Sequence, residues 1–266
     1  MKTKDLLYGL DEWVLVQIHP KIFRAIYDYA HNPGKQHQYK VLDTVPNFLR
    51  NKTSAGLDRL TDDVETLIEL LLLTQCVLPR FLDNLKTAMN TYSTVNWKDG
   101  LSRFQIQSKV WAAVQLKEYN VGELYLCGGW IGTIGRIIFD QNSSTSNITS
   151  FDIDDTANKA GEILNRDIKY TAINKDIYDI DYSNADTIVN TICEHIPNIY
   201  RWLDKIPTGK RLVLQNNNMF EMPDHINCVS DLKDFEEQVE SRVDIKYSGR
   251  ISFNKWSRYM IIGEKR

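Results

Sequence analysis

From residue 123 onward, short apolar runs alternate with longer amphipathic stretches. The apolar runs, each five to seven residues long, are LYLCG (124–128), ITSFDI (148–153), IKYTAIN (168–174), ADTIVNT (185–191) and KRLVLQ (210–215). The amphipathic stretches between them are GTIGRIIF, DTANKAGEILN and EHIPNIYRWLDKI. Strand-like runs that alternate with helical patterns are typical of βαβ units, in which helices cover both faces of a parallel sheet. The sequence therefore predicts an α/β fold for this half of the chain.

The chain ends differently, on VDIKYSGRISFNKWSRYMIIGEKR. This segment reads as two strand-like runs with no helical pattern between them. Such a terminal hairpin would add an antiparallel strand at or near the sheet edge. The basic residues of this hairpin are interpreted as solvated charges, with binding of an anionic acceptor as the alternative. They are Lys246, Arg250, Lys255 and Arg258.

The first 118 residues have a helical pattern instead. In residues 60–89, apolar side chains recur at spacings of three, four and seven, and Pro79 predicts a kink or a break. A further helical stretch, SRFQIQSKVWAAVQLKEY, leads directly into the first apolar run. We therefore predict two domains: a helical substrate or lid domain over residues 1–118 and an α/β catalytic domain over residues 119–266.

Net charge, cysteine spacing and hydropathy argue against a nucleic-acid-binding, zinc-binding or membrane-spanning protein. The formal net charge is −3, whereas proteins that bind nucleic acid usually carry a basic footprint. The four cysteines lack the CxxC and Cys/His spacings of a zinc site, so we expect reduced thiols and no metal. The most apolar window, LIELLLLTQCVL, is shorter than the ~20 residues that span a membrane, and no signal-peptide pattern opens the chain. A cytoplasmic protein without a membrane partner is expected.

A glycine-rich turn joins the first apolar run to the helix that follows. Gly128, Gly129, Gly132 and Gly135 stand at this junction. Glycines allow a sharp turn and a close approach to a ligand, and the helix N-terminus offers free N–H groups to an anion. The turn fits neither GxGxxG nor GxxxxGK[ST], which disfavours nicotinamide dinucleotides and ATP. Close packing of the helix on the strand is the alternative explanation for the glycines.

An acid follows at the end of the second apolar run. Asp152 comes 24 residues after Gly128, close to the ~20-residue spacing at which a carboxylate accepts hydrogen bonds from ribose hydroxyls. Asp154 and Asp155 then precede Thr156, where a helix is expected to start, so they serve either the ligand or the helix N-terminus. The glycine turn and Asp152 together predict a ligand that contains a ribose.

Residue pairs that include an acid also follow the next two apolar runs. Asp176-Ile177 comes after the third run, and Glu194-His195 comes after the fourth. In this order, over roughly residues 120–266, the sequence resembles the class I S-adenosylmethionine-dependent methyltransferases. The resemblance implies a Rossmann-like, mostly parallel seven-stranded sheet with helices on both faces and a C-terminal antiparallel hairpin. Here an N-terminal helical domain would precede that sheet.

The resemblance also implies S-adenosylmethionine as the cofactor. In that family the glycine turn wraps the methionine part, and the acid after the second strand binds the ribose. The acid after the third strand holds the adenine amino group, and the apolar residue beside it covers the ring. The cofactor contacts expected in this chain are Gly128, Gly129, Trp130, Gly132, Asp152, Ile153, Asp176, Ile177 and Asn190.

Two positions depart from the family pattern. An acid usually stands near the position of Tyr125, and a small residue usually stands where this chain has Trp130. The methionine ammonium would then be held by other groups, such as the backbone carbonyls of Cys127 and Gly128. Trp130 is predicted either to face the sulfonium, since an aromatic face attracts a cation, or to pack on the helix.

In the family, the fourth strand ends at the active site, often in a segment that reads xxxEH. His195 is accordingly the expected general base, with Glu194 to orient it or to bind the acceptor. His225 follows the fifth apolar run and is expected at the same rim. Three polar residues within one turn of the preceding helical stretch are expected to bind the substrate. They are Gln105, Ser108 and Lys109.

The expected acceptor is a small molecule, because the chain lacks both the (D/N/S)PP(Y/F/W) segment and the Pro-Cys pair of base-methylating enzymes. Three other functions stay open. A helical region before such a sheet is also similar to the nicotianamine synthases, which transfer the aminocarboxypropyl group of the same cofactor. An RNA or modified-nucleotide methyltransferase is the second, and a non-catalytic partner subunit that keeps the fold is the third.

Overall fold

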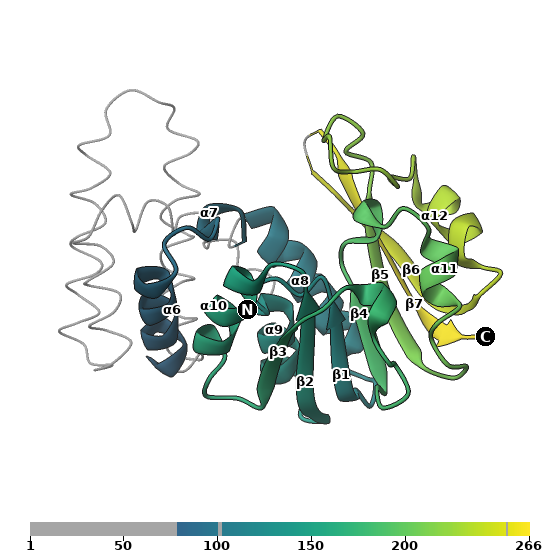
Figure 1. Ribbon diagram of the computed structural model, residues 1–266. Helices are drawn as coiled ribbons and strands as arrows, with labels where there is room; N and C mark the ends of the chain where they lie inside the picture. Colours follow the sequence, from purple (N-terminus) through teal and green to yellow (C-terminus); the bar gives the residue numbers. More distant parts are fainter. Residues whose placement is uncertain (1–78, 101–102, 254) are drawn as a thin grey trace, which may run out of the picture. The chain divides into compact units, whose positions relative to one another are not determined.

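The computed structural model describes residues 79–100, 103–253 and 255–266 (Figure 1). By its internal contacts the chain divides into two units, Met1–Val110 and Trp111–Arg266, and each is described by itself. The helical segments expected before residue 79 lie outside the described residues. The predicted domain boundary at residue 118 stays a prediction.

The described part of the first unit is helical. It contains α6 (Pro79–Thr91), α7 (Trp97–Gly100) and most of α8 (Arg103–Leu116). Helix α6 begins at its proline, which lacks an N–H and fits the first helical turn without loss of a hydrogen bond. Leu85 and Ala88, three residues apart on one face of α6, are fully buried. The helix predicted directly before the first strand is confirmed as α8.

The second unit is built on a seven-stranded sheet in the order β3-β2-β1-β4-β5-β7-β6 (Figure 1). Neighbouring strands from β3 to β5 run parallel, and β7 runs antiparallel to both β5 and β6. This confirms the predicted mixed sheet and its terminal hairpin, with β6 at the edge. The strands are β1 (Gly122–Cys127), β2 (Thr145–Asp152), β3 (Tyr170–Asn174), β4 (Thr187–Asn190), β5 (Arg211–Asn217), β6 (Val243–Ser252) and β7 (Ser257–Lys265).

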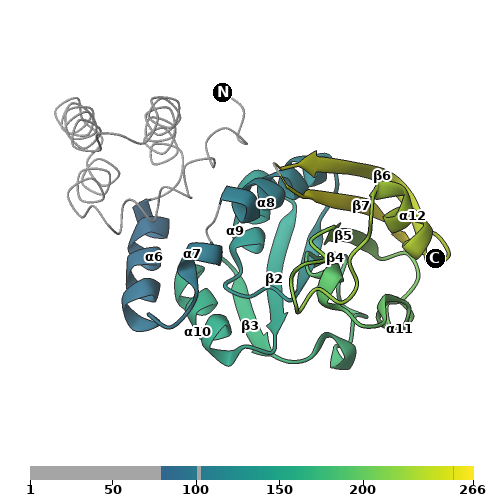
Figure 2. The same ribbon diagram turned by 90° about the horizontal axis from the view of Figure 1, so that it is seen from above.

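Helices cover both faces of this sheet. Seen from above, α9 and α10 lie on one side and α11 and α12 on the other (Figure 2). The sequence did not predict α12, because this helix is only eight residues long and lies in a polar segment. The helices and the two single turns of 3₁₀ helix are α9 (Thr133–Gln141), α10 (Asp155–Leu164), η2 (Ile177–Asp179), η3 (Cys193–His195), α11 (Ile199–Leu203) and α12 (Leu232–Val239).

Each face of the sheet carries its own apolar core. Leu212 and Leu214 of β5 belong to the core that contains Trp202 of α11 and Phe235 of α12. Val213 between them belongs to the opposite core, which contains the buried face of α9. Successive strand residues point to opposite faces, so an uninterrupted apolar run such as LVL is what a sheet covered on both sides requires.

The functional residues predicted in the second unit follow the carboxyl ends of the parallel strands. Cys127, the last residue of β1, pairs with Phe151 of β2 on one side and with Asn190 of β4 on the other. The chain order reverses between β1 and β4, and open α/β sheets bind ligands outside the carboxyl ends of the strands at such a point. Among the described residues no helix is long and apolar enough to cross a membrane.

Candidate active site

The turn after β1 has an unusual backbone. Gly128, Trp130 and Gly132 all have positive φ angles, of 63°, 48° and 70°. Glycine adopts this left-handed region at little cost, whereas a residue with a side chain does so rarely. The N–H groups of Gly128 and Gly129 both donate to the carbonyl oxygen of Phe151, at 2.9 and 3.2 Å, which holds the turn against the end of β2.

Close packing inside the protein explains why these positions are glycine. A Cβ added at Gly129 would lie 2.0 Å from Oγ of Ser150, and one added at Gly132 would lie 2.4 Å from the hydroxyl of Tyr170. The turn therefore lies directly on the sheet, and the space that each glycine leaves is filled by a neighbouring side chain. This supports the packing explanation for the glycines and leaves contact with a ligand to the backbone of the turn.

We expect Gly132→Ala to lower the free energy of unfolding by about 2 kcal/mol, in part from the left-handed backbone and in part from displacement of the buried Tyr170 ring. Gly209→Ala is the matched control, because Gly209 also has a positive φ, of 84°, but has no atom within 4 Å of the added Cβ. It should cost about 1 kcal/mol. Equal losses in urea denaturation of the two variants would contradict the role given to Tyr170.

Asp152 ties the glycine turn to the end of β2. Its Oδ2 accepts the N–H of Trp130 at 2.8 Å, and its Oδ1 accepts the N–H of Asp154 at 2.9 Å. Burial raises the pKa of the Asp152 carboxyl, and the two backbone N–H groups oppose that shift. A carboxylate oxygen accepts more than one hydrogen bond, so each oxygen keeps capacity for a ligand hydroxyl. The predicted ribose acid thus also fixes the backbone of the turn.

The next residues along this edge suit a flat apolar group. Ile153 directly follows Asp152 and is 77% exposed, the most exposed large apolar side chain among the described residues. The amide of Asn174 donates to the Ile153 carbonyl oxygen at 2.8 Å, so the position of Ile153 is fixed by β3. Asp176 accepts the N–H of Tyr178 at 2.8 Å as the cap of η2, and Ile177 packs partly on the core.

Asn190 closes β4 beside the glycine turn and is fully buried. Its Oδ1 accepts the N–H of Ile192 at 3.0 Å. Its Nδ2 has no acceptor among the described residues. A buried amide donor without a partner is uncommon in proteins, and this one lies at the strand end where a bound ligand would supply an acceptor.

The structure shows the surroundings of Tyr125 and Trp130, the two positions at which the sequence departs from the family pattern. Tyr125, near the place of the usual acid, packs its ring on Phe151 at 5.1 Å between ring centroids. The position is therefore part of an aromatic cluster under the site. Trp130 is half-buried and its backbone is held by Asp152. Whether its ring faces a sulfonium stays a prediction.

A buried ion pair lies at the end of β4. Oε1 of Glu194 accepts from Nη1 of Arg258 at 2.9 Å and from Nδ2 of Asn217 at 2.6 Å. Glu194 is 2% exposed and Arg258 is 4% exposed. The interpretation of Arg258 as a solvated hairpin charge is therefore wrong, because β7 pairs with β5 and carries its N-terminal end under the active-site edge. Sequence reasoning missed Asn217, and it named Arg258 without its contact to Glu194.

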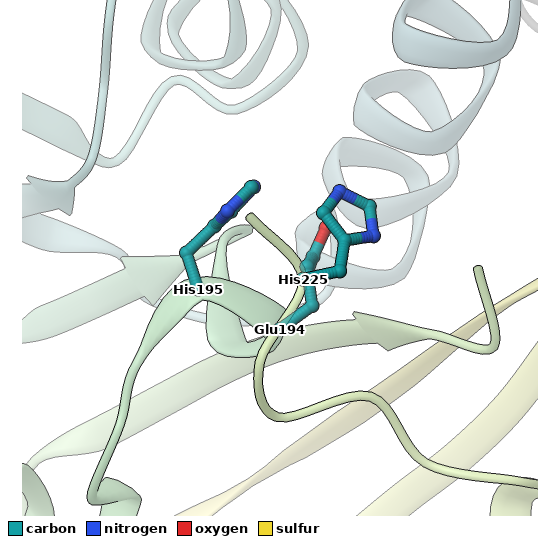
Figure 3. A group of neighbouring side chains, drawn as sticks. All are labelled: Glu194, His195 and His225. Atoms are coloured by element: carbon teal, nitrogen blue, oxygen red, sulfur yellow. The ribbon is translucent and has the colours of Figure 1, made fainter. Parts of the chain in front are cut away.

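Two histidines lie near Glu194 (Figure 3). The rings of His195, from η3, and His225, from the loop after β5, meet edge to face with centroids 4.6 Å apart. Together with Glu194 they place one ligand-capable atom each within 4.8 Å of one another. The sequence expectation that His225 reaches the same rim as Glu194 and His195 agrees with this geometry. Burial lowers the pKa of His225, against the opposing charge of Glu194.

Other candidates fall outside this cluster. Gln105, Ser108 and Lys109 lie in the first unit, where the Ser108 hydroxyl donates to the Gln105 carbonyl oxygen at 2.9 Å. Their predicted substrate contact stays a prediction. Cys193 is fully buried, and burial raises its thiol pKa well above the ordinary value, so it is a packing residue rather than a nucleophile.

Solved structures with a similar fold include methyltransferases. Geranyl diphosphate C-methyltransferase from Streptomyces coelicolor, solved with Mg²⁺, geranyl diphosphate and S-adenosyl-L-homocysteine, matches with a TM-score of 0.50 at 7% identity. The match covers 62% of this chain and 79% of that one. N-methyltransferase NodS from Bradyrhizobium japonicum matches with a TM-score of 0.47 at 8% identity, over 60% of this chain and 95% of that one.

At such identities the likeness concerns the fold alone, a Rossmann-like α/β sheet. Comparison of the sequence with protein-family profiles gives no match, and neither does comparison with curated proteins. The similarity of the N-terminal region to nicotianamine synthases stays a prediction. The function is therefore inferred from the geometry of this chain's own residues.

Proposed function

We propose that this protein is an S-adenosylmethionine-dependent methyltransferase that acts on a small-molecule acceptor. The observation that carries the proposal is the clamp made by Asp152 at the point where the strand order reverses. One carboxylate there holds the glycine turn through Trp130 and keeps acceptor capacity for two ribose hydroxyls. No nucleotide phosphate is needed to explain this arrangement.

In this proposal the cofactor lies across the carboxyl ends of β1, β2 and β4. Asp152 would bind the ribose, and the exposed side chain of Ile153 would cover one face of the adenine. Asp176 and Ile177, after β3, would contact the amino group and the ring edge. The free amide donor of Asn190 would meet an acceptor on the methionine part. These roles use donors, acceptors and apolar surface that the protein leaves unoccupied.

Methyl transfer needs few chemical groups from the protein. The acceptor atom attacks the methyl carbon in line with the sulfonium, the carbon–sulfur bond breaks with its electron pair going to sulfur, and S-adenosylhomocysteine leaves. Positioning of the two reactants supplies most of the rate. Where the acceptor carries a proton, Nε2 of His195 would accept it. The other ring nitrogen, Nδ1, already makes a hydrogen bond to the Asp224 carbonyl oxygen at 3.0 Å.

The direct test is binding of S-adenosylhomocysteine to the full chain by calorimetry, followed by incubation with labelled S-adenosylmethionine and candidate acceptors. We expect one site per chain and release of S-adenosylhomocysteine. Release of methylthioadenosine instead would indicate aminocarboxypropyl transfer. A folded protein that binds neither form of the cofactor would refute the proposal and favour a non-catalytic subunit.

The exposed isoleucine gives a sharp prediction. Ile153→Ser should weaken S-adenosylhomocysteine binding roughly 10-fold, because about 1.4 kcal/mol of apolar burial against the adenine is lost. The melting temperature of the free protein should hardly change, since Ile153 is 77% exposed. Val114→Ser is the control: Val114 is 41% exposed on α8, outside the carboxyl edge, and its replacement should leave affinity unchanged. Equal affinity of the Ile153 variant and the wild type would remove Ile153 from the adenine site.

A further inference from the structure

The hydrogen-bond partner of His195 fixes where its proton lies. Nδ1 of His195 is 3.0 Å from the backbone carbonyl oxygen of Asp224. A carbonyl oxygen can only accept, so Nδ1 carries the hydrogen and donates it. The other ring nitrogen, Nε2, then carries a free lone pair in the neutral ring. The Asp224 carboxylate is also near, with Oδ2 3.4 Å from Nδ1, and favours the same tautomer.

The position of the hydrogen on the His225 ring is fixed in the same way, by its hydrogen bond to Asn217. Nδ2 of Asn217 donates to the Glu194 carboxylate at 2.6 Å, and Oδ1 of Asn217 accepts the N–H of Met219 at 2.9 Å. These two partners fix which end of the amide is oxygen. Since that oxygen lies 3.2 Å from Nδ1 of His225, this nitrogen is the donor, and Nε2 is again left with its lone pair.

One carboxylate oxygen of Glu194 likewise keeps its lone pairs free. Its Oε1 is engaged by Arg258 and Asn217, whereas its Oε2 is buried and has no partner among the described residues. A buried carboxylate oxygen without a hydrogen bond costs stability, so an occupant that supplies positive charge there would be favoured.

We propose that Glu194, His195 and His225 form a binding site for a divalent transition-metal ion, with Glu194 Oε2 and the two Nε2 atoms as ligands. One ligand atom from each residue lies within 4.8 Å of the others (Figure 3). Metal-bound histidines characteristically donate their second ring N–H to a carbonyl or carboxylate, as both rings do here. In tetrahedral coordination at about 2.1 Å, ligand atoms lie about 3.4 Å apart, so binding of an ion would draw these side chains closer together.

The ligand set selects the kind of ion. Two imidazole nitrogens and one carboxylate oxygen suit Zn²⁺, Fe²⁺, Co²⁺ or Mn²⁺, whereas Mg²⁺ and Ca²⁺ prefer all-oxygen sites. No metal was expected from the sequence, in which the two histidines are 30 residues apart, His195 in η3 and His225 in the loop after β5. Tertiary structure unites them, since η3 follows β4 and the His225 loop follows β5, which are neighbouring strands.

Three protein ligands leave at least one coordination position for water or an acceptor. Within the proposed function, on which this role rests, the ion would hold an acceptor hydroxyl beside the methyl group and lower the pKa of that hydroxyl. The proton would then leave to solvent water, because the lone pair of His195 is given to the ion. The oxygen attacks the methyl carbon as before. Ion binding itself does not require methyl transfer.

The test is a titration of the chelator-treated full chain with Zn²⁺ and, separately, with Co²⁺, followed by calorimetry and by the visible absorption of bound Co²⁺. We expect one ion per chain. His195→Gln and His225→Gln should each weaken binding at least 10-fold, and the double variant should abolish the Co²⁺ spectrum. His37→Gln, which removes a histidine from elsewhere in the sequence, is the control and should bind as the wild type does.

S-adenosylhomocysteine binding, measured in the same samples, separates the two proposals. The histidine variants should keep it, which also shows that they are folded, while Asp152→Asn should lose it and keep the ion. One ion bound with equal affinity by the wild type and the double variant would overturn the metal site, and so would the absence of binding to the wild type. Neither outcome bears on the cofactor.

Discussion

Asp152→Asn is expected to weaken S-adenosylhomocysteine binding about 100-fold. The variant loses the charge that strengthens two ribose hydrogen bonds, each of about 1.5 kcal/mol. It also sets an amide N–H₂ against the N–H of either Trp130 or Asp154, since both oxygens of the carboxylate accept backbone donors. The glycine turn would then lose its anchor. Calorimetric titration of the purified variant measures the effect.

Asp155→Asn is the matched control for that change. It removes the same charge three residues away, from a side chain that only pairs with Lys159 on the surface of α10. Affinity should change less than 3-fold. Similar losses in both variants would mean that general charge, rather than a ribose contact, is being measured.

Cofactor binding should also depend on pH through Asp152. Burial raises the pKa of this carboxyl above its ordinary value. The carboxylate is therefore present above that raised pKa and is lost as the pH falls through it. Affinity for S-adenosylhomocysteine should fall in the same direction in the wild type, and the Asp152→Asn variant should lack this dependence.

Arg258→Met should lower the free energy of unfolding by about 3–5 kcal/mol. The substitution keeps a long side chain but leaves the buried carboxylate of Glu194 without its positive partner, 2.9 Å away. Breaking one half of a buried pair is costly because the remaining charge stays out of water. Urea denaturation should be measured after treatment with a chelator, because a bound cation would neutralise Glu194 independently.

The double variant Glu194→Gln with Arg258→Met isolates the cause. It removes both charges and should recover at least about 2 kcal/mol relative to Arg258→Met alone. If the double variant were as unstable as the single one, the loss would come from packing of the arginine side chain, and the ion pair would not be what holds β7 to the end of β4.

Much of the fold was predictable because the strands have uninterrupted apolar runs, as strands buried on both faces require. The LVL of β5 cannot be a half-exposed strand, and its neighbours in sequence show helical spacing, so a doubly covered parallel sheet follows. The terminal hairpin was recognised from two strand-like runs without a helix between them. Helix α12 was missed because its apolar contribution to the core is small: Phe235 and Val239 are its only buried residues.

Some residues of the candidate site were likewise predictable from the sequence, and others were not. The position of Asp152 at the end of β2 could be predicted because it depends on spacing along one βαβ unit, which the sequence displays directly. Asn217 and Arg258 could not. The run NNN at 216–218 resembles a polar turn, yet the middle residues of β5 and its end are buried, and Asn217 is a hydrogen-bond hub of the site. Arg258 stands about sixty residues from Glu194, so no local pattern connects them.

By itself, then, the sequence determined the α/β class, the place of the glycine turn and the acids that follow the strands, because periodicity and spacing act over short stretches of chain. Only the tertiary structure decided which polar groups meet. The pairing of β7 with β5 brings Arg258 to Glu194, and the adjacency of β4 and β5 brings His225 to His195. Contacts between residues far apart in sequence depend on strand order, which alternation of apolar and amphipathic segments does not specify.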